Sequence, residues 1–164
     1  MLTVFQKAEG LIILTYQALA VSVLEDGQPR VSHLDAMERV FKAIIPIHPK
    51  RLSVITVLCR FAGVPKISEE FRKRAAELGK LTRDQTLGSA MIYEGTGLQA
   101  TVVRGMISMS QVMNRLPHPV ETFASDQEAF VWIGSLPNQL PVIRDAVPTL
   151  ISELRRYTTK AKVG

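Results

Sequence analysis

The chain repeats one pattern three times between residues 52 and 133: a short apolar run, then a segment with the periodicity of a helix. The apolar runs are residues 52–59, 87–93 and 120–123, and the helical segments that follow them are residues 68–79, 96–114 and 125–133. Strands that alternate with helices in this way are parallel and are joined by crossover helices. The pattern therefore predicts an α/β fold in which the three strands share one sheet. Ser68 is the expected N-cap of the first of these helices, and Gly79 its expected end.

The N-terminal region adds two strands to this expectation. Residues 3–8 and 11–17 are strand-like and are separated by Glu9 and Gly10, which is typical of a hairpin. Residues 18–30 fit no regular pattern apart from turn residues near their end. Ser32 is then expected to cap a helix that ends before Pro46. The expected fold is a mixed sheet of about five strands, with an antiparallel hairpin first, βα units after it, and helices packed on the sheet.

The C-terminal region predicts one more helix, over residues 139–157, outside the βα units. Its apolar residues recur every three or four positions and form one stripe: Leu140, Ile143, Val147, Leu150, Ile151 and Leu154. Such a stripe has to be covered, either by the chain's own core or by a partner or a second subunit. We therefore divide the chain into a domain of residues 1–134 and an amphipathic helical extension of residues 135–164.

Composition excludes several classes of function. The net charge of +5 is mild, and the densest basic patch, residues 72–74, contains no aromatic side chains that could stack bases, so nucleic-acid binding is not expected. The single cysteine, Cys59, allows no internal disulfide, and no cysteine and histidine spacing fits a zinc site. No segment is long and apolar enough to span a bilayer. We expect a cytoplasmic protein that requires no metal and no cofactor.

Two features could contact a ligand. Gly95, Thr96 and Gly97 follow a strand and open a helix, where backbone N–H groups can hold an anion, although a tight turn with an N-cap explains the same residues. The segment lacks both the dinucleotide-binding glycine spacing and the Walker lysine. Methionines along residues 97–114 could line an adaptable binding surface or simply fill the core. We find no catalytic triad, metal motif or nucleophile elbow, and so expect no enzyme.

The order of elements resembles the STAS-like group, the domain found in anti-sigma-factor antagonists and sulfate-transporter tails, and in particular its poorly characterised bacterial branch. The most similar stretches are residues 88–104 and 120–133, and the resemblance covers about residues 3–133. Antagonists in this group carry a phosphorylated segment of the type Asp-Ser-Ser/Thr-Gly at a helix N-terminus. Here Ser68 occupies that place, but Glu69 and Glu70 follow it and would repel a phosphate. Ser68 is thus either a phosphorylation site or an ordinary N-cap.

The resemblance implies a non-enzymatic, regulatory module that interacts with another protein or with a second copy of itself. The alternative is a domain that binds a small ligand or a lipid in an apolar pocket beside the Met-rich helix of residues 97–114. An exposed apolar patch would favour the first reading, and a cavity with a few convergent polar groups would favour the second.

Overall fold

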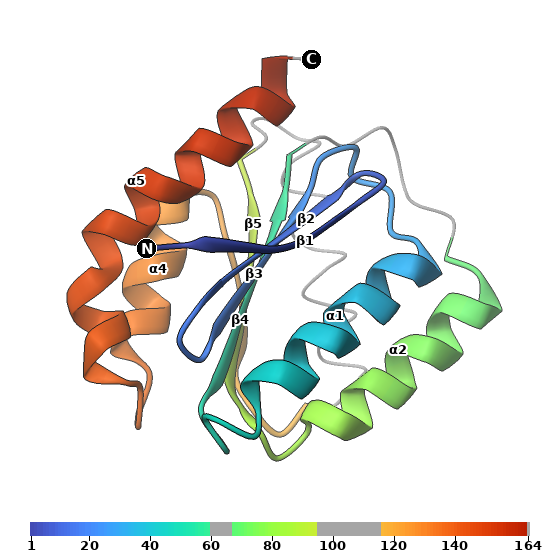
Figure 1. The fold of residues 1–164 in the computed structure, drawn as a ribbon, viewed down its shortest axis with the longest axis horizontal. Helices are drawn as coiled ribbons and strands as arrows, with labels where there is room; N and C mark the ends of the chain where they lie inside the picture. Colours follow the sequence, from blue (N-terminus) through green and yellow to red (C-terminus); the bar gives the residue numbers. More distant parts are fainter. Residues whose placement is uncertain (60–66, 95–115, 164) are drawn as a thin grey trace.

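The computed structural model describes residues 1–59, 67–94 and 116–163 (Figure 1). In chain order the elements are β1 (Thr3–Ala8), β2 (Leu11–Tyr16), β3 (Leu19–Leu24), α1 (Val31–Ile44), β4 (Leu52–Leu58), α2 (Glu69–Thr82), β5 (Thr86–Tyr93), β6 (Val120–Phe123), α4 (Asp126–Ser135) and α5 (Pro141–Val163). The described strands form one sheet in the order β1-β2-β3-β4-β5-β6. The α/β class is confirmed.

The sheet changes from antiparallel to parallel at β3. The pairs β1–β2 and β2–β3 are antiparallel, whereas β3–β4, β4–β5 and β5–β6 are parallel. The predicted hairpin and the three predicted parallel strands are therefore confirmed. Consecutive parallel neighbours joined by crossovers of one hand place their helices on one face. Accordingly, α1 and α2 lie together on one face of the sheet, and α4 and α5 cover the other (Figure 1).

Strand β3 is an element that the sequence does not reveal, and it raises the count from the expected five or so to six strands within the described residues. Its residues are almost entirely buried, as expected of a strand paired on both sides and covered on both faces. The turn between β2 and β3 cannot be recognised in the sequence, because Gln17 rather than a glycine adopts the left-handed conformation there, with φ of +53°. Because the sequence has no typical turn residue between them, β2 and β3 form one uninterrupted apolar stretch along the chain.

Two predicted helix ends are wrong. Helix α1 begins at Val31 after Arg30, two residues before the position that a Ser32 cap would give. The turn starts early because the backbone N–H of Arg30 donates to His33 Nδ1 while the Arg30 guanidinium binds Asp26. Helix α2 passes through Gly79 and continues to Thr82, since Leu78 and Thr82 bury its last turn. Gly79 faces open space and does not stop the helix.

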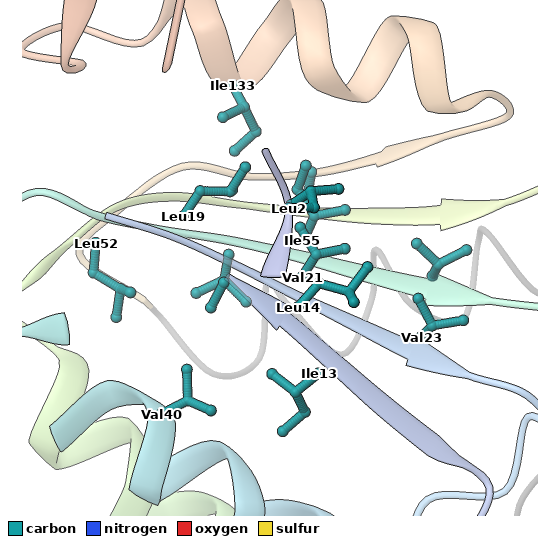
Figure 2. Packing of buried hydrophobic residues seen from close by; sticks show 14 of the residues in the cluster. Leu2, Ile13, Leu14, Leu19, Val21, Val23, Val40, Leu52, Ile55 and Ile133 are labelled. Atoms are coloured by element: carbon teal, nitrogen blue, oxygen red, sulfur yellow. The ribbon is translucent and has the colours of Figure 1, made fainter. Parts of the chain in front are cut away.

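The core lies on both faces of the sheet, and strand register decides which residue faces which helices. Figure 2 shows Leu19 of β3 beneath Ile133 of α4. Ile13 of β2 and Val40 of α1 lie on the opposite side of the sheet. A small apolar gap remains between α1 and β2–β4, lined by residues such as Met37 and Val54. The gap is too narrow to hold a ligand.

Candidate ligand site on strands β5 and β6

Strand register places four side chains side by side on the α1/α2 face of the sheet. Ser89 pairs with Val120, and Met91 pairs with Thr122, which is one pleat further along both strands. Alternate residues of a strand point to opposite faces. On β5, Gly88 faces Trp132 and Leu136, which cover the α4/α5 side, so Ser89 and Met91 point to the other side.

The same rows continue into β4, where Val54 lies opposite Ser89 and Thr56 opposite Met91. Val54 lines the gap beneath α1, which identifies this as the α1/α2 face. Thr56 accepts a hydrogen bond from Ser22 of β3, with 3.1 Å between the hydroxyl oxygens. The face therefore carries a mixture of hydroxyl and apolar side chains across the parallel strands.

His118 is held over this face by Ser89. The distance between Ser89 Oγ and His118 Nε2 is 3.1 Å. The backbone N–H of Ser89 donates to the carbonyl oxygen of Pro119 at 3.0 Å, which fixes the turn that carries the imidazole against β5. Because Ser89 contacts both the side chain of His118 and the next residue's backbone, the imidazole ring has a defined place at the start of β6.

Two polar atoms at this site are buried and have no hydrogen-bond partner: His118 Nδ1 and Thr122 Oγ1. His118 Nδ1 lacks a hydrogen-bond partner in either tautomer of the imidazole. If Nε2 donates to Ser89, Nδ1 is a buried acceptor without a donor, and if Nε2 accepts from Ser89, Nδ1 is a buried donor without an acceptor. Buried polar groups in native proteins are nearly always satisfied by protein, water or ligand.

The described residues around His118 bring little charge close to its imidazole ring. Burial lowers the pKa of His118 from its ordinary value, and no charged group among the described residues contributes to the shift. The imidazole is therefore neutral at neutral pH. The adjacent side chains on the sheet face, Ser89, Val120 and Thr122, are uncharged as well.

The described residues of this site lack the arrangement that a serine nucleophile requires. A serine nucleophile needs a base that is itself oriented by a third group, and donors that hold an oxyanion. Here His118 Nδ1 has no orienting partner, and the backbone N–H of Ser89 is engaged with Pro119. The site contains neutral hydrogen-bonding groups, two of which, His118 Nδ1 and Thr122 Oγ1, have no partner.

A charged pair at the carboxyl edge of the sheet is already satisfied. The guanidinium of Arg155 binds the carboxylate of Asp126 through two hydrogen bonds of 2.7 and 2.9 Å. The pair joins α5 to the N-terminus of α4 and raises the pKa of Arg155, chiefly through the hydrogen bond to Asp126. Its geometry indicates a structural connection.

The predicted site residues are distributed differently. Ser68 is exposed and caps α2, where its hydroxyl oxygen accepts a hydrogen bond of 3.1 Å from the N–H of Phe71. The N-cap is thus present, and phosphorylation of Ser68 stays a prediction. Gly95, Thr96, Gly97 and the Met-rich segment 97–114 lie outside the described residues.

The predicted stripe on the C-terminal helix is covered by the chain itself. Ile143, Leu150 and Leu154 are buried in the core, and Leu140, Val147 and Ile151 pack against it. Of the two covers left open by the sequence, the structure shows the first, so these residues do not form a free surface for a partner. They are covered because α5 lies along α4 and reaches β3.

Sequence reasoning missed Ser89, His118 and Thr122 because a sequence does not show which residues of neighbouring strands are paired. The available signal was the two-residue spacing of His118, Val120 and Thr122, which places these three side chains on one side of an extended segment that runs into β6.

Comparison with protein-family models, with curated proteins and with solved structures gives no match. In the part of the chain that the structure describes, no helix is long and apolar enough to cross a membrane. The same residues contain no cluster of three side chains suited to hold a metal ion.

Proposed function

We propose that this chain is a small-molecule-binding module whose ligand lies on the α1/α2 face of β5 and β6. One observation carries the proposal: His118 Nδ1 and Thr122 Oγ1 are both buried on that face without a hydrogen-bond partner. An unsatisfied buried polar group costs about 1–3 kcal/mol. A ligand that supplies the missing hydrogen-bond partners would recover this free energy, and the recovered free energy would add to its affinity.

The position of the site supports the proposal. Ser89, Met91, Val120 and Thr122 are only partly buried, unlike the residues of β5 that face α4. Binding sites combine an apolar lining with a few polar groups that fix the ligand's orientation. The face of β5 and β6 has this composition, whereas the gap beneath α1 is too small to admit a molecule.

The test is a ligand screen read by nuclear magnetic resonance of methionine methyl groups. Met91 lies in the site, whereas Met37 belongs to α1 and faces the gap beneath that helix, and Met1 is exposed at the N-terminus. We expect compounds that bind to shift the Met91 methyl signal, identified with a Met91→Leu variant, while the signals of Met37 and Met1 stay in place.

Substitution of Thr122 provides the matched control for this screen. Thr122→Val removes the unpartnered hydroxyl and keeps the shape of the side chain, so it should weaken binding of every hit. Thr3→Val makes the same change on the exposed strand β1 and should have no effect. A broad screen in which no compound shifts Met91 would refute the proposal.

A second candidate function rests on strand β1. This edge strand exposes two apolar side chains, Val4 at 36% and Phe5 at 42% of their full accessibility. Exposed edges can recruit a strand from a partner, so a STAS-like regulatory module of the bacterial cytoplasm could dock another protein here. Lys7 and an irregularity between Val4 and Gln6 argue against it, because both features protect edges from pairing.

The second candidate is tested by affinity purification from the source cell with mass spectrometry. If β1 recruits a protein, a Phe5→Asp variant should lose the partner that the unmodified chain retains. A partner retained equally by both would exclude β1 as the docking surface.

A further inference from the structure

We infer that this chain docks on an anionic membrane surface through the amino edge of its sheet, the end at which β4 and β5 begin. The amino edge consists of three turns, residues 45–51, 83–85 and 136–140. Figure 1 shows these turns together at one end of the molecule, the lower end in that view. The inference goes beyond the proposed function and uses none of the residues of the β5–β6 site.

Hydrogen bonds hold the three turns of the amino edge together. The backbone N–H of Lys50 donates to Gln85 Oε1 at 3.0 Å, and the N–H of Leu52 donates to the carbonyl oxygen of Gln85 at 2.9 Å. The guanidinium of Arg51 donates to the carbonyl oxygen of Asn138 at 2.5 Å. The turns therefore form one connected surface rather than three separate loop tips.

This surface is basic. Lys50, Lys80 and Arg83 are exposed, and the ion pairs among the described residues involve none of them. Lys80 and Arg83 lie three residues apart at the end of α2, so their side chains emerge on the same side of that helix. Asp84 is the single carboxylate in the sequence of the three turns.

The rest of the chain does not offer these cations a counter-charge. Residues 60–66 and 95–115, which lie outside the described structure, contain no aspartate or glutamate. The positive charge of the amino edge is therefore available to an anionic partner. A membrane leaflet that contains anionic lipids attracts basic side chains that lie close to its surface.

An exposed apolar side chain belongs to the same surface. Ile47 is 72% exposed, more than any other large apolar side chain of the described residues except Met1. Pro46 and Pro49 lie on either side of it in the sequence and are exposed as well. Peripheral proteins hold a lipid surface with this combination, because the cations meet the headgroups while the apolar side chain enters the acyl boundary.

Ile47 also favours a membrane over a soluble polyanion. Cations alone are sufficient to bind an acidic peptide or a nucleic acid, and neither partner gives an isolated isoleucine an apolar environment. The three turns contain no phenylalanine, tyrosine or tryptophan on which bases could stack. A lipid surface is the partner that uses both the charge and the apolar side chain.

The experiment measures sedimentation of the full chain with two kinds of vesicle. One contains equal parts of phosphatidylserine and phosphatidylcholine, and the other contains phosphatidylcholine alone. We expect binding to the mixed vesicles to be tighter by about tenfold or more, and to weaken as salt is added, because salt screens exposed charges. Equal binding to the two kinds of vesicle, or no binding to either, would overturn the inference.

Two neutralising variants test the cations. Lys50→Gln and Arg83→Gln should each weaken binding to the mixed vesicles about fivefold, the effect of one basic side chain near an anionic surface. Lys73→Gln removes an exposed cation from an earlier turn of α2 and is the matched control, which should bind nearly as well as the unmodified chain. If both edge variants bind as tightly as this control, the amino edge is not the docking surface.

A third variant separates a membrane from a soluble acidic partner. Ile47→Ser should weaken binding to the mixed vesicles about tenfold, because it removes the side chain that leaves water. Val131→Ser, at a 55% exposed position on α4, should leave binding unchanged. If Ile47→Ser binds the vesicles as well as the unmodified chain, or if the chain binds soluble polyglutamate as tightly as vesicles, the partner is a soluble polyanion and the inference is wrong.

Discussion

Individual residues take their roles here from backbone geometry and burial. Gly10 closes the β1–β2 hairpin with φ of +68°, a conformation that side chains other than glycine rarely adopt. A Cβ at this position would lie 2.8 Å from Asp26 Oδ2 and 2.8 Å from Arg30 Nη1. The glycine thus allows the Asp26–Arg30 pair, which positions the start of α1, to lie against the hairpin.

Replacing Gly10 by alanine should therefore be strongly destabilising. We expect Gly10→Ala to lower the free energy of unfolding by about 1–3 kcal/mol, because the new side chain adds backbone strain and displaces the ion pair. Chemical denaturation measures the change. Gly79→Ala, at a helical position with open space around it, is the control and should be neutral or stabilising.

The histidine at the candidate site makes stability depend on pH. Burial lowers the pKa of His118 in the folded chain relative to the unfolded chain. Above the unfolded pKa of about 6.5 both states are neutral at this position and stability is complete. As the pH falls below that value, the unfolded state takes up the proton first and stability declines, until the folded pKa is passed.

His118→Gln should remove this dependence. Between pH 7 and pH 5, the unfolding free energy of the variant should therefore change less with pH than that of the unmodified chain. The two slopes against pH should differ by at most the uptake of one proton. Urea denaturation at several pH values measures it. The pKa of Asp26 is lowered mainly by its hydrogen bond to Arg30, so the stabilisation that Asp26 contributes to the fold is also lost in acid, but only below about pH 4. Equal slopes for the two proteins between pH 7 and pH 5 would contradict the assignment.

At the scale of elements, an ion pair joins the two helices on each face of the sheet, but α5 is held mainly by apolar packing. Arg74 of α2 forms ion pairs with Asp35 and Glu38 of α1, and with Glu77 of its own helix. Part of the basic patch predicted at residues 72–74 is therefore used to hold α2 against α1. Helix α5 instead buries Ile143, Leu150 and Leu154 against α4 and the sheet.

The burial of α5 predicts how its substitutions behave. Leu150 is completely buried, so Leu150→Ala should lower the unfolding free energy by about 2–5 kcal/mol through lost contacts and an unfilled cavity. Val142, on the same helix, is 43% exposed, and Val142→Ala should change it by less than about 1 kcal/mol. Thermal denaturation with sedimentation compares them. If Leu150→Ala reduced the oligomeric mass and left the melting temperature unchanged, α5 would be an interface.

At the scale of the whole molecule, the two ends of the chain are connected. The buried carboxylate of Glu153 on α5 accepts a hydrogen bond from the backbone N–H of Leu2, which precedes β1. Leu2 itself is buried in the same core as α5 (Figure 2). Because this contact joins residues so distant in sequence, we expect it to couple the unfolding of the first strand to that of the last helix.

Removing this connection should affect both ends at once. Glu153→Leu leaves the N–H of Leu2 buried without an acceptor and should lower the unfolding free energy by about 1–3 kcal/mol. Glu153→Gln retains an acceptor and should cost less. Hydrogen exchange measures the effect, and we expect faster exchange in β1 and in the last turns of α5. Faster exchange at only one end would show that the two ends do not unfold together.

The sequence by itself determined the elements that periodicity encodes. The hairpin, the three parallel strands, the cap at Ser68 and the amphipathic C-terminal helix all follow from patterns of a few neighbouring residues. Only the tertiary structure decided the rest. Strand β3 became visible through its pairing on both sides, and the structure decided that the chain's own core covers the stripe of α5.

The candidate site belongs to that second group for a physical reason. Ser89 and His118 are 29 residues apart, and a hydrogen bond between them depends on the register of β5 against β6. A shift of one residue would turn Thr122 to the other face of the sheet. Register is set by the packing of both faces at once, which is why local sequence patterns predicted the strands but did not predict the polar atoms that they bring together.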